Sequence, residues 1–154
     1  MNEFMKIAIE EALDGMKSNE GGPFGAIIVR NGVIISRAHN EVVKTNDPTA
    51  HAEVTAIRKA CATLGRFDLS DCEIYSSCEP CPMCFAAIHW AKIKKLYYGS
   101  TREDAANIGF DDQYIYDVIK GTAKKLQVEV LQIHRKESLK PFREWKAKID
   151  KIKY

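Results

Sequence analysis

The sequence lacks a long apolar run, a large net charge and a low-complexity tract. Its 154 residues carry 23 Lys and Arg against 21 Asp and Glu, a formal net charge of +2. Hydrophobic residues make up 45% of the chain, yet no run approaches the roughly 18 apolar residues of a membrane span. These absences exclude a disordered chain and a membrane span. The length suits a single domain, 1–154, with one sizeable core.

A targeting segment is also missing from the sequence. Residues 1–20 contain five acidic residues, whereas transit peptides are poor in acidic residues and secretory signals begin with positive charge. The five cysteines are odd in number and three fall within residues 78–84, which argues against a disulfide framework. We therefore expect a cytoplasmic protein without a membrane partner, whose clustered cysteines are metal ligands or catalytic groups.

The small net charge hides an asymmetry along the chain. Residues 1–119 hold 12 Lys and Arg against 17 Asp and Glu, whereas residues 120–154 hold 11 against 4. The first segment is therefore acidic and the second strongly basic. A basic segment of this kind indicates an acidic partner, a nucleic acid or a solvated helix face.

Helix-type and strand-type patterns alternate along the chain. An amphipathic stripe opens it, and two β-branched runs flank Asn31-Gly32, the strongest short-range signal for a hairpin. Asp47 can cap a helix that Gly65 ends. The expected helices cover 3–17, 49–64, 82–91, 103–119 (with a break near Gly109) and 139–152, and the expected strands cover 24–30, 33–39, 72–77, 94–100 and 126–133. This alternation predicts an α/β domain with helices on both faces of one sheet.

Three residues near the starts of two expected helices have the types and spacing of a metal site. Cys81 and Cys84 stand at i and i+3, so their sulfurs face the same side of one helix, while His51 lies at the start of the other. The positive end of a helix favours thiolates over thiols. One imidazole and two thiolates suit zinc, and three protein ligands leave a fourth position for water, as in catalytic zinc sites.

Glu53 lies two residues from His51, close enough to reach that water without ligating the metal. Zinc lowers the pKa of bound water to about 7, so the carboxylate can take its proton at neutral pH and pass it to a substrate nitrogen. That chemistry is hydrolytic deamination. C-x-x-C also occurs in redox and structural zinc sites, and a structural Cys₃His site that includes Cys78 is a further alternative.

The stretches PTAHAEVTAIRKAC (48–61) and SCEPCPMCFAAIHWA (77–91) resemble those of the cytidine deaminase superfamily, which is marked by H-x-E followed by P-C-x-x-C. The resemblance implies a three-layer α/β/α fold around a central mixed sheet of about five strands. It also implies one zinc ion per subunit, with Glu53 as the catalytic proton shuttle. The implied zinc ligands are His51, Cys81 and Cys84.

Further stretches resemble the bacterial guanine deaminases within that superfamily. They are TNDPTAHAEV (45–54), GFDD (109–112) and SLKPFREW (138–145) together with the terminal Tyr154. The resemblance implies hydrolysis of guanine, a purine base, to xanthine and ammonia, with water attacking C2. The implied substrate-binding residues are Phe24, Asn40, Ala52, Trp90, Asp112 and Tyr154.

The same resemblance implies a role for each of these residues. The Asn40 side chain and the backbone N–H of Ala52 would hydrogen-bond the purine, and two aromatic rings, Phe24 and Trp90, would line a flat pocket. Asp112 would act as a second catalytic carboxylate that helps to protonate the leaving amine. The terminal tyrosine would close a neighbour's active site in a domain-swapped homodimer, in which 138–154 crosses to the partner.

Each role has a structural alternative. Phe24 and Trp90 lie among apolar residues and could be core residues, Asn40 could be a turn residue, and Asp112 could cap the following helix. A terminal residue such as Tyr154 is usually frayed.

The substrate also has alternatives. The protein could deaminate adenosine in tRNA, or another small aminated ring such as cytosine, a triazine or a nucleoside, or it could be a zinc-stabilised binding module without turnover. The acidic character of residues 1–119 counts against a nucleic acid.

Overall fold

The computed structural model describes residues 2–154, and a mixed sheet of four strands lies at its centre. The strands are β1 (Gly25–Arg30), β2 (Val33–His39), β3 (Glu73–Cys78) and β4 (Lys95–Ser100). Their order across the sheet is β2-β1-β3-β4. β1 is antiparallel to both β2 and β3, while β4 runs parallel to β3.

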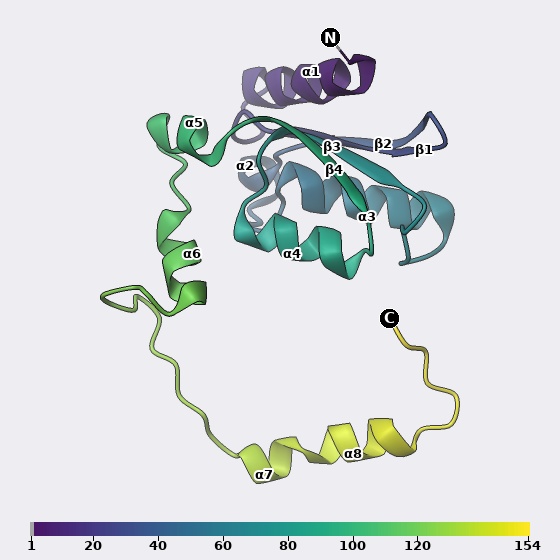
Figure 1. Ribbon diagram of the computed structural model, residues 1–154, viewed down its shortest axis with the longest axis vertical. Coiled ribbons are helices and arrows are strands. Elements are labelled where there is room, and N and C mark those ends of the chain that lie inside the picture. The colour runs from purple at the N-terminus through teal and green to yellow at the C-terminus, as the bar shows by residue number, and fades with distance from the viewer. Residues whose placement is uncertain (1) are drawn as a thin grey trace.

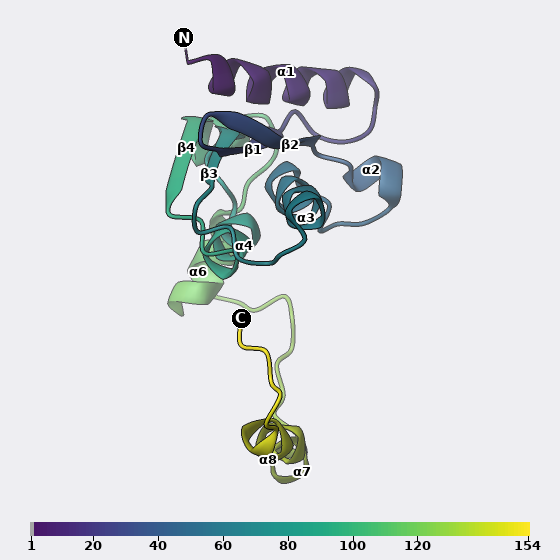
Figure 2. The ribbon, with the colours of Figure 1, turned by 90° about the vertical axis from the view of Figure 1, so that its right-hand side faces the viewer.

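Helices cover both faces of this sheet. They are α1 (Glu3–Lys17), α2 (Val42–Thr45), α3 (Ala52–Leu64), α4 (Pro82–Trp90), α5 (Arg102–Asn107), α6 (Gln113–Lys120), α7 (Arg135–Ser138) and α8 (Lys140–Ala147). α1 lies on one face, and α3 and α4 lie on the other (Figures 1 and 2). The three-layer α/β/α arrangement predicted from the sequence is therefore confirmed. Among residues 2–154, no helix has both the length and the apolar character needed to cross a membrane.

The β1–β2 hairpin follows from its two turn residues. Asn31 and Gly32 both have positive φ, 50° and 76°. A two-residue turn with positive φ at both positions matches the right-handed twist of the flanking strands, and glycine adopts such a φ without steric cost. The predicted hairpin is confirmed.

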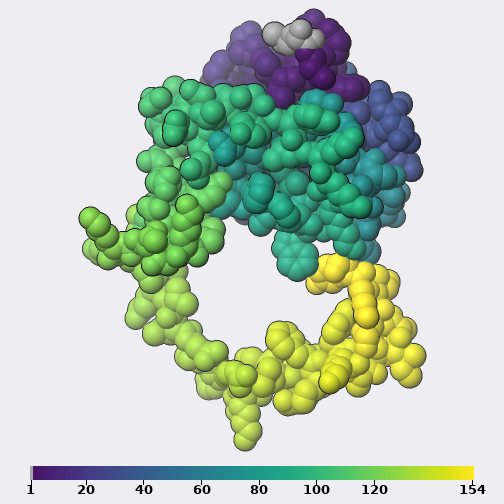
Figure 3. All heavy atoms as spheres, in the orientation of Figure 1, coloured from purple at the N-terminus to yellow at the C-terminus, as the bar shows by residue number. Residues whose placement is uncertain are grey.

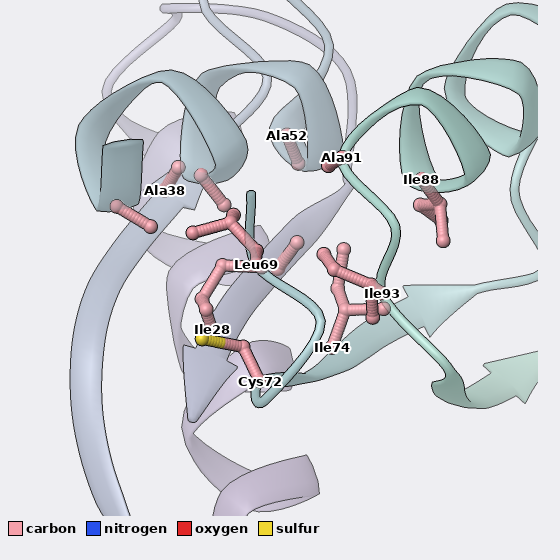
Figure 4. Packing of buried hydrophobic residues seen from close by; sticks show 12 residues of the cluster. Ile28, Ala38, Ala52, Leu69, Cys72, Ile74, Ile88, Ala91 and Ile93 are labelled. Atoms are coloured by element: carbon pink, nitrogen blue, oxygen red, sulfur yellow. The ribbon is translucent and has the colours of Figure 1, made fainter. Parts of the chain in front are cut away.

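Alternating side chains along the strands build two cores, one on each face of the sheet. Ile28 and Ile74 point toward α3 and α4, where they meet Leu69 and other buried residues (Figure 4). Ile27 and Tyr75, their neighbours along the strands, point toward α1. Burying each large aliphatic side chain contributes about 1.5–3 kcal/mol, so this packing holds α3 and α4 firmly on one face.

The start of α3 differs from the sequence-based expectation. Asp47 does not cap the helix, because its Oδ1 accepts hydrogen bonds from the backbone N–H and the hydroxyl of Thr49, at 2.8 and 2.7 Å. The N-cap is instead His51, in extended conformation, and the helix ends as expected at Gly65, with φ 64°. The later start places the His51 side chain at the positive end of the helix.

The strand predicted over 126–133 is wrong, and the sheet has four strands rather than about five. After α6 the chain turns away from the sheet, so this segment has no strand edge to pair with (Figure 1). Its apolar side chains are exposed: Leu126, Val128, Val130, Leu131 and Ile133. We call residues 121–154, which include α7 and α8, the C-terminal arm. Figure 3 shows that the arm leaves the body formed by residues 2–120 and returns to it only at the C-terminal end.

Candidate active site

A cavity of about 740 Å³ opens where the starts of α3 and α4 meet the segment between α5 and α6. Its walls come from stretches that are far apart in the sequence. Six of the residues predicted from the sequence line it: Phe24, Asn40, His51, Glu53, Cys81 and Asp112.

Three ligand-type side chains converge at this cavity, and two of them, His51 and Cys81, line it. His51 is the N-cap of α3, Cys81 is the N-cap of α4, and Cys84 lies in the first turn of α4. Nδ1 of His51 lies 3.5 Å from the sulfur of Cys81 and 3.5 Å from that of Cys84. The three ligand atoms all lie within 4.8 Å of one another.

These distances fit a tetrahedral zinc ion. Zinc–nitrogen and zinc–sulfur bonds are about 2.1 and 2.3 Å long. With a tetrahedral nitrogen–zinc–sulfur angle, the nitrogen and sulfur atoms lie about 3.6 Å apart. Both nitrogen–sulfur distances agree with that value. The nearby Cys78 does not join the cluster, because its thiol donates to the carbonyl of Thr101 at 3.5 Å.

Electrostatic coupling within the cluster favours negative charge on the sulfur of Cys81. A hydrogen bond from the Cys84 thiol, partly opposed by burial, lowers the pKa of Cys81, and the same bond raises the pKa of Cys84. The contact with Cys81 raises the pKa of His51. A thiolate at the positive end of α4 is the form of cysteine that ligates metals.

Glu53 lies beside these ligands, in the first turn of α3. Its side chain lines the cavity although the residue is only 6% exposed, and burial raises its pKa above the usual range. The hydroxyl of Ser76 on β3 donates to Oε1 of Glu53 at 3.1 Å. A buried carboxyl with a raised pKa can hold and release a proton closer to neutral pH than an exposed one.

Asn40 forms one wall, with its carboxamide orientation fixed by the backbone. Oδ1 accepts hydrogen bonds from the N–H of Val42 at 3.1 Å and of Gly22 at 3.4 Å. A Cβ on Gly21 would come within 2.1 Å of the same oxygen, so only glycine leaves room for it. Because Oδ1 is held by the backbone, the NH₂ group is left to face the cavity as a donor.

Phe24, just before β1, and Asp112, the N-cap of α6, also line the cavity. The ring of Phe24 meets the edge of Phe110 at a centroid distance of 4.9 Å. Gly109, with φ 96°, turns the chain between α5 and α6. Burial raises the pKa of Asp112, the Cys81 sulfur adds to this effect, and the Arg102 guanidinium opposes it.

Two predicted site residues lie away from the cavity of their own chain. Trp90, at the last turn of α4, is 69% exposed, and its ring centroid is 6.2 Å from that of Tyr154. Tyr154 also lies 6.3 Å from the ring of Phe67. Ala52 is fully buried as the first residue of α3, a position at which the backbone N–H has no partner within the helix.

Several residues in or next to the cavity wall were not predicted from the sequence. Phe110 adjoins the aspartates of the GFDD stretch and could have been found as an aromatic beside a predicted site residue. Arg102 and Glu79 line the cavity because β3 and β4 are parallel neighbours, so the chain segments that follow them lie side by side. Ser76 carried no sequence signal, since its strand appeared wholly structural.

A second cluster of residues that can ligate metals consists of Glu20, His39 and Glu41. Its side chains already have protein partners. Nε2 of His39 contacts Glu20 at 2.6 Å, and Nδ1 contacts Glu11 at 3.3 Å. The Lys44 ammonium lies 2.9 Å from Glu20 and 3.4 Å from Glu41, where a cation would sit. These contacts tie the loop after α1 to the end of β2, beside the cavity.

Comparison with known proteins agrees with this geometry. The chain is 48% identical over 151 residues to the guanine deaminase of Bacillus subtilis, covering 98% of this chain and 97% of that one. The crystal structure of guanine deaminase from Bacillus subtilis matches all of this chain and 99% of that chain, with a TM-score of 0.94. A tRNA-specific adenosine deaminase of Agrobacterium fabrum is 37% identical, over 84% of this chain and 90% of its own length.

Residues 1–100 match the cytidine and deoxycytidylate deaminase zinc-binding region. This match contains the three ligand-type side chains and the buried glutamate at the cavity. The chain therefore belongs to the cytidine and deoxycytidylate deaminase family.

Proposed function

We propose that this protein catalyses the zinc-dependent hydrolytic deamination of guanine to xanthine and ammonia, a step of purine catabolism. The observation that carries the proposal is the similarity to a guanine deaminase, which is 48% identical over 151 residues and spans 98% of this chain. The match to the tRNA-specific deaminase of Agrobacterium is weaker and covers less of the chain. The acidic body is also a poor surface for an RNA backbone.

In this proposal His51, Cys81 and Cys84 hold one zinc ion per subunit. When bound there, zinc would lower the pKa of a water molecule to about 7 and so supply a nucleophile at neutral pH. The two cysteine ligands must stay reduced to bind the metal, and we therefore assign the protein to the cytoplasm.

Glu53 would move the proton. Its carboxylate accepts the proton from the attacking water and delivers it to a ring nitrogen of guanine as C2 becomes tetrahedral. A second transfer, assisted by Asp112, moves the proton of the new hydroxyl on C2 to the amino group; the C2–N bond then breaks, ammonia leaves, and the hydroxyl oxygen becomes the C2 carbonyl of xanthine. The raised pKa of Glu53 brings its proton affinity closer to those of the attacking water and the ring nitrogen of guanine.

Two donors would select guanine over adenine. Because Oδ1 of Asn40 is held by the backbone, its NH₂ group remains as a donor, and the backbone N–H of Ala52 has no partner within α3. Guanine presents two acceptors, N7 and O6, along one edge, whereas adenine presents one acceptor and one donor. A mismatched donor left unpaired in a buried site costs about 1–3 kcal/mol, which is enough to discriminate between these bases. Phe24 would stack on or border the flat ring.

The proposal is tested by measuring ammonia release from guanine, guanosine, adenine and cytosine with zinc-loaded protein. We expect turnover of guanine, identified as xanthine by its absorbance, and little from adenine. Glu53→Gln keeps the shape of the side chain and removes its proton affinity, so it should retain zinc and lose turnover. No turnover of guanine by the zinc-loaded wild type would contradict the substrate, and tight tRNA binding in a gel shift would favour the tRNA alternative.

We further propose that the C-terminal arm crosses to a second copy of the chain in a domain-swapped homodimer. The arm exposes apolar side chains, among them Val130 at 78% and Phe142 at 71%, which monomeric proteins rarely leave in water along one segment. It is strongly basic, whereas residues 1–119 are acidic, so the two are complementary in charge. Tyr154 of the partner subunit would then close each cavity.

The swap is tested with a variant that lacks 138–154. We expect it to run as a monomer in light scattering after gel filtration and to lose guanine turnover at the same time. If the truncated protein remains an active dimer, the swap is contradicted and residues 138–154 are only a solvent-exposed helix.

A further inference from the structure

A serine on the central sheet contacts the proposed proton shuttle. Oγ of Ser76 donates to Oε1 of Glu53 at 3.1 Å, and the two residues are 2% and 6% exposed. The hydrogen bond connects β3 to the first turn of α3, across the interface between sheet and helix. The hydrogen bond is therefore shielded from water. Hydrogen bonds to charged groups are stronger in the protein interior than in water.

Ser76 occupies a position that would otherwise be apolar. Along β3, Ile74 belongs to the core under α3 and α4, whereas Tyr75 belongs to the core under α1, so Ser76 faces α3 and α4 by alternation. Its antiparallel partner in β1 is the fully buried Ala26. A hydroxyl in such a place destabilises the fold unless it is hydrogen-bonded, and its one proton is given to the carboxylate.

We propose that Ser76 is a positioning residue for the deamination, an inference that rests on the proposed role of Glu53. The terminal torsion of a glutamate side chain is broad, so a carboxylate without a fixed partner rotates between orientations. By holding Oε1, the serine hydroxyl fixes the plane of the carboxylate and directs Oε2 into the cavity. Oε2 is then the oxygen that takes and returns the proton, and each transfer begins from an aligned geometry.

A second buried serine provides a matched control. Ser36, on β2, is 7% exposed, and its hydroxyl donates to the backbone carbonyl of Ala56 at 2.8 Å. Both serines therefore attach the sheet to α3 through one buried hydrogen bond. Ser76 binds the Glu53 carboxylate, whereas Ser36 binds a backbone carbonyl. Removal of either hydroxyl should therefore lower stability by a similar amount, but only removal of the Ser76 hydroxyl should affect catalysis.

The experiment compares Ser76→Ala, Ser76→Thr and Ser36→Ala by zinc content, Tm, kcat and KM for guanine. We expect Ser76→Ala to keep zinc and to lose about 10- to 100-fold in kcat, with KM little changed, because aligned proton transfer is lost while binding remains. Ser76→Thr, which retains the hydroxyl, should recover most of kcat. Ser36→Ala should lower Tm with kcat unchanged. Equal kcat in Ser76→Ala and Ser36→Ala would overturn the inference.

A structural measurement keeps the inference separate from the choice of substrate. Crystal structures of the wild type and Ser76→Ala should show the Glu53 carboxylate in one orientation in the first and rotated or in two orientations in the second. If the wild type does not deaminate guanine, the proposed function fails, and these two structures still decide the positioning role. An identical carboxylate in both would refute it.

Discussion

The carboxamide oxygen of Asn40 accepts a hydrogen bond from the backbone N–H of Val42 at 3.1 Å, at the edge of the cavity. This contact, together with the one from Gly22, occupies the carboxamide oxygen and leaves the NH₂ group of Asn40 as the donor available at the cavity. The first prediction follows from this arrangement.

Asn40→Asp replaces the inward donor with an acceptor that carries negative charge. Because the purine edge proposed to bind there presents acceptors, we expect kcat/KM for guanine to fall about 10- to 100-fold. Steady-state kinetics on the zinc-loaded variant measure this. Asn46→Asp, at an exposed asparagine after α2, is the matched control and should leave kcat/KM unchanged. Wild-type kinetics in Asn40→Asp would contradict the assigned orientation.

The metal site gives the second prediction. Cys84→Ala removes one of the two sulfurs that lie 3.5 Å from His51, so the variant should purify without stoichiometric zinc. Turnover should fall about a thousandfold or more, because the nucleophile is no longer generated at neutral pH. Metal analysis and ammonia release measure the two effects. Cys61→Ala, on the half-exposed part of α3 and outside the cluster, should keep its zinc. Full zinc occupancy in Cys84→Ala would rule out the assigned ligand set.

Arg102 gives a prediction about pH dependence. Its guanidinium stacks 4.2 Å over the ring centroid of Tyr116, and its charge opposes the burial that raises the pKa of Asp112. Arg102→Gln removes that charge, so the pKa of Asp112 should rise further. As the pH falls, the carboxylate should then become protonated at a higher pH than in the wild type. We expect the acid limb of the kcat/KM profile to shift upward. Arg66→Gln, which breaks an ion pair with Asp71 outside the cavity, should leave the limb in place.

Asp68 gives a prediction about stability. Hydrogen bonds from the hydroxyl and the backbone N–H of Ser70 lower the pKa of Asp68 from 3.8 to about 2, and Lys92 lies 3.4 Å from its carboxylate. A lowered folded-state pKa stabilises the fold above the unfolded value, and this contribution is lost as pH falls from about 4 to about 2. Asp68→Asn should therefore lower Tm at pH 7, and its difference from the wild type should shrink below pH 4. A Tm difference that stays constant with pH would contradict this assignment.

Local patterns were enough to predict most of the elements and the chemistry of the site. Asn31-Gly32 predicted the hairpin because few other dipeptides adopt positive φ twice in succession. The spacing of Cys81 and Cys84 predicted a shared face because one helical turn separates them. Such features depend on neighbours in the sequence, and the structure agrees with them.

Long-range geometry decided the rest. The pattern of 126–133 is that of a strand, yet a strand forms only beside an edge with free hydrogen-bonding groups, and the chain leaves the sheet before reaching one. Ser76 looked like an ordinary strand residue, and only the packing of α3 on the sheet brought its hydroxyl to Glu53. The sequence by itself determined which chemical groups this protein carries and their local conformations. The tertiary structure decided which of them meet, because contacts between distant segments depend on how sheet and helices pack.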